Sequence, residues 1–178
     1  ASKISAESYP LFRADQRKQL PPGVDSINQL FCIADWLAIY FQKKVLLTLR
    51  TTHVLAFLMG LMFILYNDVG RFANFMIAFL LFFGLSAGIQ KVAARQGWHR
   101  KYLDYRTLAE GLRVQFYWAV AGVGNQNNSK FAHDNFLQTQ DPELGWIRNI
   151  MRVAGTQCDA KRESSTASLE FVVREWIG

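Results

Sequence analysis

The chain has 178 residues and a formal net charge of +6, from 20 Lys and Arg against 14 Asp and Glu. This length suits one ordinary domain or a piece of a longer protein. The two cysteines, Cys32 and Cys158, are too few and too far apart for a disulfide framework or a zinc site. The sequence has no Gly-rich phosphate loop, HExxH or GxSxG motif, so the enzyme classes that use them are not indicated.

The first 25 residues predict an arm or linker. Pro10 and the mixed-charge stretch LFRADQRKQL favour an irregular lead-in from something upstream. Because the sequence starts at Ala1 and ends directly after the apolar stretch VVREWI, we expect a piece of a longer protein.

Residues 26–47 predict one amphipathic helix that leads into the membrane. Pro21-Pro22-Gly23 breaks the chain before it, and Asp25 or Ser26 can supply the N-cap oxygen. The apolar residues then recur at spacings of three and four, which places them on one stripe: Ile27, Leu30, Phe31, Ala34, Leu37, Ala38 and Phe41.

Two apolar segments, 48–66 and 72–89, predict a transmembrane hairpin with an outer turn at 67–71. A span needs about 20 largely apolar residues, and the second segment has eighteen with no charge. The first reaches this length only by including Arg50, which we expect to reach the headgroups, and His53, which we interpret as an interfacial histidine rather than a proton relay. The alternative is a buried helix pair in a soluble protein. It is less favoured because 72–89 is apolar on all sides.

Basic residues lie at the ends of both spans that face away from the turn. Lys43, Lys44 and Arg50 precede or begin the first span, and Lys91, Arg95, Arg100 and Lys101 follow the second, whereas the turn holds only Arg71. Since Lys and Arg mark the cytoplasmic side, we expect both termini in the cytoplasm. The charge favours a surface that faces anionic lipid, and we expect no nucleic-acid partner.

Small residues predict where the spans pack. Gly84 and Gly88 form a GxxxG motif on the second span, and Gly60 is a small residue on the first span that could pack against it. Small residues let helices in lipid approach closely, either within the hairpin or between protomers, and the sequence leaves both open. Two spans cannot enclose a pore, so any role in breaching the bilayer requires a homo-oligomer.

Residues 90–178 predict a cytoplasmic helical region. The second span should continue as helix, with a heptad seam that packs on the 26–47 helix of the same or another subunit. Glycines and asparagines at 122–128 should end this helix, and a further helix should start at Asp141-Pro142-Glu143 and stop near Gly155. We expect a loop at 156–168 and the start of a last helix at 169–177. The seam positions are Trp98, Tyr102, Tyr105, Ala109, Leu112, Phe116 and Ala119.

The charged residues on the seam helix predict ion pairs rather than catalysis. Arg106 and Glu110 are spaced i,i+4, and Glu110 and Arg113 are spaced i,i+3, which are ordinary intrahelical pairs. His99 would lie about 16 Å from Glu110 along a helix, too far for a dyad. His133-Asp134 is a weaker candidate still. We therefore expect no catalytic, cofactor or metal residues, and no enzyme.

The stretch WHRKYLDYRTLAEGLRVQFYWAVAGV (98–123), after a two-span hairpin that IADWLAIYFQKK (33–44) precedes, resembles a known family. It is similar to the SMODS- and SLOG-associating two-transmembrane effector domains of bacterial defence systems, over roughly residues 26–178. The resemblance implies a module of the bacterial inner membrane that a nucleotide- or ligand-sensing domain activates. It also implies oligomerisation and membrane permeabilisation in antiphage defence. No sensor domain is visible in this sequence, so an upstream domain or a separate protein would supply the signal.

Together these features predict an all-α membrane protein, with a two-helix transmembrane hairpin continued into a cytoplasmic helical bundle. Two other functions stay open from the sequence. One is a constitutive membrane anchor or scaffold for a cytoplasmic partner. The other is a small oligomeric ion channel, whose pore would have to be hydrophobic because neither span carries a polar stripe.

Overall fold

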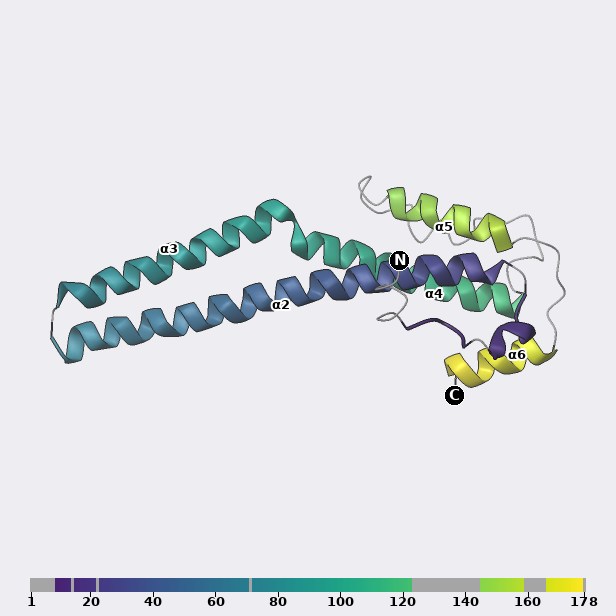
Figure 1. Cartoon of the computed structure of the whole chain (residues 1–178), viewed down its shortest axis with the longest axis horizontal. Coiled ribbons are helices and arrows are strands. Elements are labelled where there is room, and N and C mark those ends of the chain that lie inside the picture. Colours follow the sequence, from purple (N-terminus) through teal and green to yellow (C-terminus); the bar gives the residue numbers. More distant parts are fainter. Residues whose placement is uncertain are drawn as a thin grey trace. The chain divides into compact units, whose positions relative to one another are not determined.

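A computed structural model of the chain describes residues 9–13, 15–21, 23–70, 72–122, 145–158 and 166–177. These residues are predominantly helical and contain no strand, which confirms the all-α prediction. Figure 1 shows the order of the helices along the chain. They are the 3-10 helix η1 (Gln16–Gln19), α2 (Val24–Asp68), α3 (Ala73–Gln96), α4 (Trp98–Ala121), α5 (Gly145–Cys158), α6 (Thr166–Val172) and the π-helical turn η5 (Val173–Ile177).

The chain divides into two compact units. One, here called the helical domain, comprises Ala1–Ala38 with Asp104–Gly178, and the other, the hairpin unit, comprises Ile39–Leu103. Helices α2 and α4 each contribute residues to both units.

Helix α2 joins two segments that the sequence analysis treated separately. Its 45 residues run without interruption through the expected amphipathic helix and first span, and it ends two residues beyond the predicted end of that span. No proline occurs between residues 24 and 68, so nothing in this stretch removes a backbone donor from the helical ladder. Gly23, with φ of 96°, directly precedes the helix.

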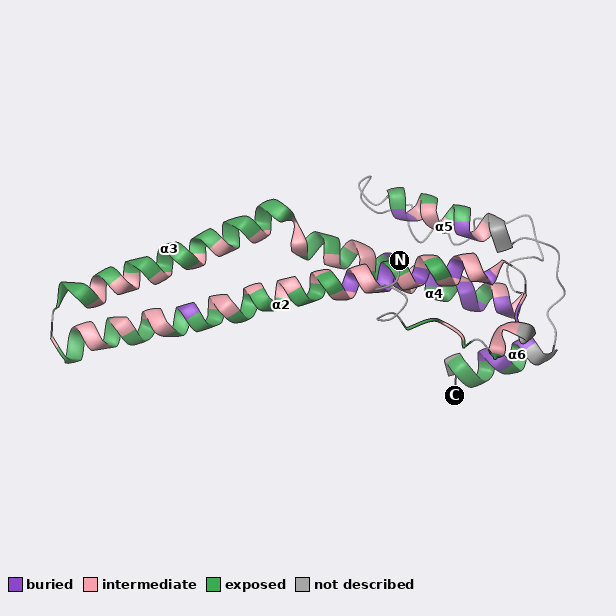
Figure 2. Cartoon of the chain, in the orientation of Figure 1, coloured by how far each residue is buried: buried purple, intermediate pink, exposed green. Residues whose placement is uncertain are grey.

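The helical domain has one hydrophobic core, formed by α2, α4, α5 and α6 (Figure 2). The expected stripe of α2 and the expected seam of α4 both supply buried residues to it. Leu108, Tyr117 and Val120 were not part of the predicted seam, and they are buried because α4 packs on more than one neighbour. The fully buried large side chains are Phe116, Phe171, Ile27, Leu112, Ile147, Val24 and Val120.

The prediction of an arm at residues 1–25 needs a correction. Leu20 and Val24 are buried in the core, and the ring of Phe12 stacks on that of Phe116 with 5.8 Å between centroids. The backbone N–H of Leu11 donates a 2.8 Å hydrogen bond to Asn28 Oδ1. Burial of these apolar side chains makes residues 11–24 part of the helical domain rather than a separate linker.

The expected continuation of the second span into the seam helix is wrong. Helix α3 ends at Gln96, and Gly97 adopts a left-handed conformation with φ of 61° before α4 begins at Trp98. The backbone N–H of Gly97 donates to the carbonyls of Ala93 and Ala94, which satisfies acceptors at the helix end. Glycine takes this conformation at low cost because it has no Cβ.

The last helices differ from the prediction at their ends. The expected start at 141–144 lies outside the described residues, as do 123–140, and α5 is described from Gly145. It runs to Cys158, past the stop predicted near Gly155, and α6 begins at Thr166, so both ends of the loop expected at 156–168 are helical, and its remaining residues lie outside the described ones. Residues 169–177 are helical as predicted.

Candidate membrane-spanning hairpin

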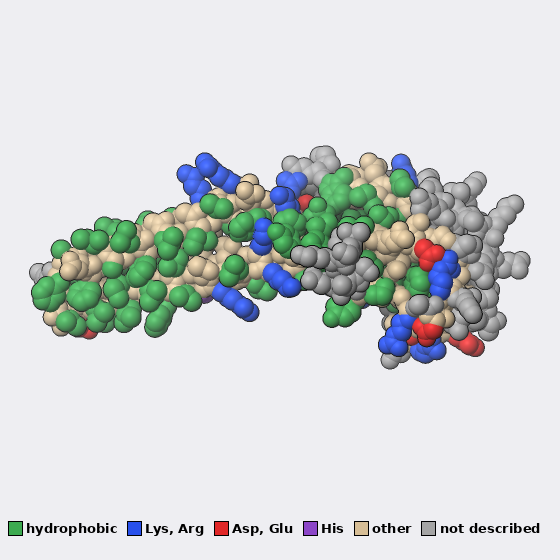
Figure 3. All heavy atoms as spheres, viewed as in Figure 1, with side chains coloured by type: hydrophobic (Ala, Val, Ile, Leu, Met, Phe, Trp, Pro, Cys, Tyr) green, Lys and Arg blue, Asp and Glu red, His purple; other side chains and the backbone are tan. Residues whose placement is uncertain are grey.

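Helices α2 and α3 are both long and apolar enough to cross a membrane. The 24 residues of α3 correspond to about 36 Å, and a hydrocarbon core is about 30 Å thick. None of the residues of α3 is buried, and in the hairpin part of α2 only Leu55 is. In Figure 3 apolar side chains cover the visible face of the hairpin.

This exposed apolar surface needs a cover that the hairpin itself does not supply. Large side chains such as Phe57 and Leu81 are 71% and 66% exposed. Soluble monomers rarely expose a continuous apolar patch larger than a few hundred Å², so lipid or another protein must cover the hairpin. The described residues of the chain do not bury the hairpin, so the buried helix pair that the sequence left as an alternative would need its cover from another protein or domain.

The polar side chains at the start of the first span are bonded within their own helix. The hydroxyls of Thr48, Thr51 and Thr52 donate to the carbonyls of Lys44, Leu47 and Thr48, at 3.0, 2.8 and 2.8 Å. His53 Nδ1 lies 2.7 Å from the carbonyl oxygen of Leu49, and it must carry the proton because a carbonyl only accepts. These bonds lower the cost of placing the four side chains near lipid.

Lysines and aromatic rings meet at the end of the hairpin unit that lies away from the turn. Lys44 Nζ lies 4.7 Å from the ring centroid of Tyr40 and 5.1 Å from that of Trp98, and Lys101 Nζ lies 5.6 Å from that of Phe41. We call these five residues the aromatic–lysine cluster. Tryptophan, tyrosine and lysine are typical of the membrane–water interface, and a cation over a ring face is attracted by its quadrupole.

The other predicted interface residues, Lys43, Arg50, Lys91 and Arg95, are all exposed. Figure 3 shows Lys and Arg side chains gathered towards the same end of the hairpin. The sequence analysis found the basic residues by the positive-inside pattern. It missed their aromatic partners, because Lys44 and Trp98 are far apart in the sequence.

The turn at the opposite end depends on Gly70. Its φ is 151°, and the N–H of Phe72 donates to its carbonyl at 2.7 Å. A Cβ at this position would lie 2.8 Å from the ring of Phe72, which is exposed and can rotate away, so it is the backbone angle that favours glycine. Arg71 lies outside the described residues.

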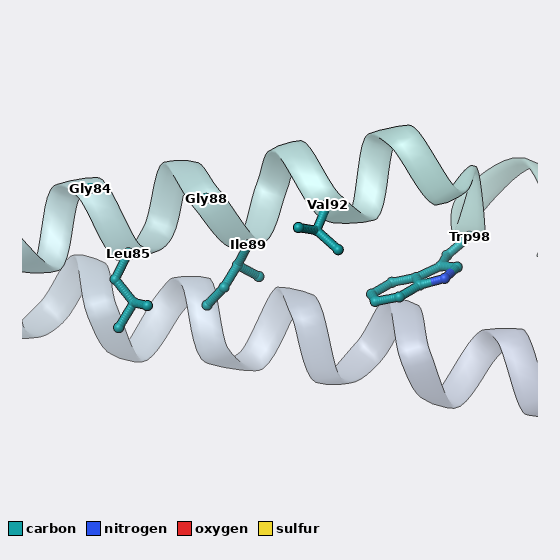
Figure 4. A pocket seen from close by; sticks show the side chains of 6 residues that line it. All are labelled: Gly84, Leu85, Gly88, Ile89, Val92 and Trp98. Carbon is teal, nitrogen blue, oxygen red and sulfur yellow. The ribbon is translucent and has the colours of Figure 1, made fainter.

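The three glycines predicted as packing positions have no close neighbour in the chain. A Cβ built on Gly60, Gly84 or Gly88 meets nothing within 4 Å, so they do not bring α2 and α3 into close approach. Packing inside the hairpin therefore does not explain them, and contact between protomers stays a prediction. Gly84 and Gly88 instead line a cavity of about 410 Å³ that is open to the surroundings, together with Leu85, Ile89, Val92 and Trp98 (Figure 4).

The seam residues divide between the two units. Ala109, Leu112 and Phe116 are buried in the core of the helical domain, and Tyr105 packs edge-on against Trp146, with 5.9 Å between ring centroids. Trp98 and Tyr102 are half-buried residues of the hairpin unit, and Ala119 is half-buried at the edge of the core.

The predicted charged residues form a network that includes one aspartate the sequence analysis missed. Glu110 accepts from Arg106 at 2.6 Å and from Arg113 at 3.5 Å, and Asp35 of α2 lies 3.6 Å from Arg106. Burial raises the pKa of Asp35 above its usual value, and the Arg106 guanidinium opposes this only in part. The network links α2 to α4 within the helical domain, which is a structural role. No three His, Cys, Asp or Glu side chains in the described ranges are grouped to hold a metal ion.

No family model matches the sequence, and comparisons with curated proteins and with solved structures find no significant match. Membership of the two-transmembrane effector family therefore stays a prediction from the 98–123 motif.

Proposed function

We propose that this chain is a membrane effector module that is anchored by the α2–α3 hairpin in the bacterial inner membrane, with both termini cytoplasmic. On a signal from a sensor domain or partner protein, hairpins of several copies assemble and permeabilise the membrane in antiphage defence. The observation that carries the proposal is a helix long enough to span, α3, with no buried residue.

The membrane location is supported by the distribution of side chains on the hairpin. Its large apolar residues are exposed along both helices, and its lysines and aromatic rings gather at one end. Lipid covers such a surface without an additional partner, and the basic end lies in the cytoplasmic headgroup region.

The assembly step is supported by the glycines that the hairpin leaves uncovered. In lipid the association of helices depends on close backbone approach, which small residues permit. Gly60, Gly84 and Gly88 have room for a neighbouring backbone because no atom of the chain occupies it. The resemblance of residues 98–123 to the defence effectors supports permeabilisation as the outcome of assembly.

The control step requires two states of the helical domain. A signal can shift the equilibrium only if a ligand or partner contacts the two states differently. The α4 face places Leu112 and Phe116 in the core, so a rearrangement of this helix would disturb the packing of the helical domain.

Expression of the full chain in bacteria, with its activating signal or with clustering through a fused dimeriser, tests the proposal. We expect membrane depolarisation and uptake of an impermeant dye. The double variant Gly84→Leu, Gly88→Leu should lose most of this leak, whereas Ala87→Leu, an exposed neighbour outside the cavity, should retain it. Undiminished leakage from the double variant would contradict the assembly step.

A constitutive anchor is the second candidate, and one observation favours it over an ion channel. The described part of the second span carries only Asn74 and Ser86 as polar side chains, so an ion channel built from it would have a hydrophobic pore without a polar selectivity lining. A chain that stays monomeric in native mass spectra and causes no leak would be an anchor.

A further inference from the structure

We infer that the face of α4 that carries Tyr105, Gly111 and Gln115 is an interface between copies of the chain. In the resting state α5 docks on this face of its own chain, and in the activated state it docks on the same face of a second copy. This inference rests on the proposed function and supplies the two states of the helical domain that its control step requires.

Helices α4 and α5 lie side by side and run in the same direction. Their contacts pair residues that rise together along both helices: Tyr105 with Trp146, Gly111 with Met151, and Gln115 with Gly155. In Figure 1 the colours of the two helices change in the same direction. Helices that a short loop joins are normally antiparallel neighbours. The position of α5 is therefore set by its own contacts with α4 and not by a tight turn between them.

The connection between the two helices is long enough for α5 to reach another copy. Residues 122–144, 23 in all, separate Ala121 from Gly145. Connections between packed helices usually have about 2–8 residues. A chain of 23 residues spans at most roughly 75 Å, and the return from Ala121 to Tyr105 along α4 needs only about 24 Å. The length of the connection therefore permits docking within one chain or between two.

The shape of the α4 face identifies α5 of a second copy as the partner. Met151 Sδ occupies the room that Gly111 leaves, since a Cβ on that glycine would lie 2.8 Å from the sulfur. Gln115 Nε2 donates to the Met151 carbonyl at 2.9 Å, and a Cβ on Gly155 would lie 2.5 Å from the same nitrogen. A second copy presents an identical helix with an identical fit. Exchange of identical elements is a low-cost way to join two copies, because it needs no new kind of contact.

Two features limit how firmly α5 is held on α4. Ile147 and Ala154 are the only buried residues among those described for α5. Gln115 Oε1 is buried and has no hydrogen-bond partner in the described part of the chain, and such an atom costs free energy. Release of α5 lets water reach this oxygen, which offsets part of the contact area that is lost.

Local concentration decides which copy α5 occupies. A helix that is connected to its own docking face competes with the same helix of another copy at an effective concentration on the order of millimolar. Dispersed copies therefore keep α5 on their own α4. A sensor that gathers copies raises their local concentration towards this value, and the same contacts then form between chains. Exchange links the chains and brings their hairpins together.

Disulfide trapping between two differently tagged chains in isolated membranes tests the inference. One chain carries Gly111→Cys and the other Met151→Cys, and Cys32 and Cys158 are replaced by serine in both, so a disulfide can only join two copies. We expect clustering through a fused dimeriser to raise the cross-linked fraction about tenfold or more, because the local concentration approaches the effective one. The control uses Val153→Cys in place of Met151→Cys. Val153 is 57% exposed and lies on the opposite side of α5, so this pair should cross-link little.

A second cysteine pair and a lock make the test independent of one variant. Gln115→Cys with Gly155→Cys repeats the measurement one turn further along both helices and should agree. The lock places Gly111→Cys and Met151→Cys in one chain and oxidises them before clustering. We expect a disulfide within the chain, which shows that α5 docks in the variant, and loss of most of the leak until a reductant is added.

Cross-linking between chains that does not exceed the control for either pair would overturn the inference. Equal cross-linking of dispersed and clustered chains would overturn it also, because the resting state would then be exchanged already. A leak that the oxidised lock does not diminish would exclude α5 exchange as the control step. Specific cross-linking of clustered chains without any leak would support the exchange and contradict the permeabilisation proposed above.

Discussion

Placing one lysine at two equally exposed positions of the hairpin distinguishes lipid from a protein partner as its cover. Leu81, in the middle of the second span, and Leu47, next to the basic end, are both 66% exposed. If the hairpin were covered by water or by a polar partner surface, Leu81→Lys and Leu47→Lys would have similar effects. In a bilayer they differ, because only Leu81 lies near the midplane.

The expected difference is large. Leucine at the centre of a span contributes about −0.3 to −0.6 kcal/mol to insertion, and lysine there costs about 2.5 to 3.5 kcal/mol. The exchange at Leu81 therefore costs roughly 3 to 4 kcal/mol, which is about a hundredfold to a thousandfold in the insertion equilibrium. At Leu47 the ammonium can reach the headgroups, so we expect a much smaller cost.

The assay is labelling of a cysteine in the turn from outside intact spheroplasts. Asp68→Cys is exposed at the end of α2, and Cys32 and Cys158 are replaced by serine to remove other thiols. An impermeant maleimide should label the parent chain and Leu47→Lys, and it should label much less of Leu81→Lys. Equal labelling of both lysine variants would refute the membrane assignment, and absence of labelling in the parent would refute the orientation.

Three further predictions concern stability, measured by thermal or denaturant unfolding of the detergent-purified chain. Phe116→Ala should lower the free energy of unfolding of the helical domain by about 3 to 5 kcal/mol, because the ring is fully buried and packs on other aromatic rings. Val114 is exposed, so Val114→Ala should change this free energy by only about 0.5 kcal/mol. Equal effects of the two variants would contradict the burial of Phe116 in the core. The pKa of Asp35 is raised in the folded state, so the folded chain binds the proton of this carboxyl group more tightly than the unfolded chain does. As the pH falls from neutral through that pKa, the wild type should therefore gain stability relative to Asp35→Asn. A loss of stability relative to Asp35→Asn would disprove the raised pKa. Gly70→Ala should destabilise the hairpin by about 1 kcal/mol or more, because residue 70 has a positive φ. Gly60 lies within a helix with open space around it, so Gly60→Ala should be neutral or stabilising. A larger destabilisation by Gly60→Ala than by Gly70→Ala would exclude the described turn.

Periodicity and apolar length predicted the parts of the fold that depend on local pattern. The stripe of Ile27, Phe31 and Ala34 and the seam of Leu112 and Phe116 meet in one core because each is a continuous apolar face. The two long apolar helices followed from composition for the same reason.

The features that the sequence missed depend on contacts between distant residues or on single backbone angles. A lone glycine inside a helical pattern, such as Gly97, is compatible with either a continuous helix or a left-handed end. The burial of Leu20 was hidden because it follows a charged stretch and precedes two prolines. Asp35 could have been found, since it is a carboxylate within the apolar stripe of α2, but its partner Arg106 is far along the chain.

The cavity could not have been predicted from the sequence. The GxxxG motif indicated a face of α3 with small residues, but it did not indicate whether another helix would pack against that face. Only the space around Gly84 and Gly88 distinguishes a hollow from a close helix contact.

The bonds of Thr48, Thr51, Thr52 and His53 to their own helix give the first span an adjustable length. Because the three hydroxyls and the Nδ1 proton have partners inside α2, this turn can lie in the headgroup layer or in the hydrocarbon. One helical turn is about 5.4 Å, comparable to the thickness differences between natural membranes. In the proposed membrane location, with Arg50 reaching the headgroups, the hairpin would therefore match bilayers of different thickness with no change in its fold.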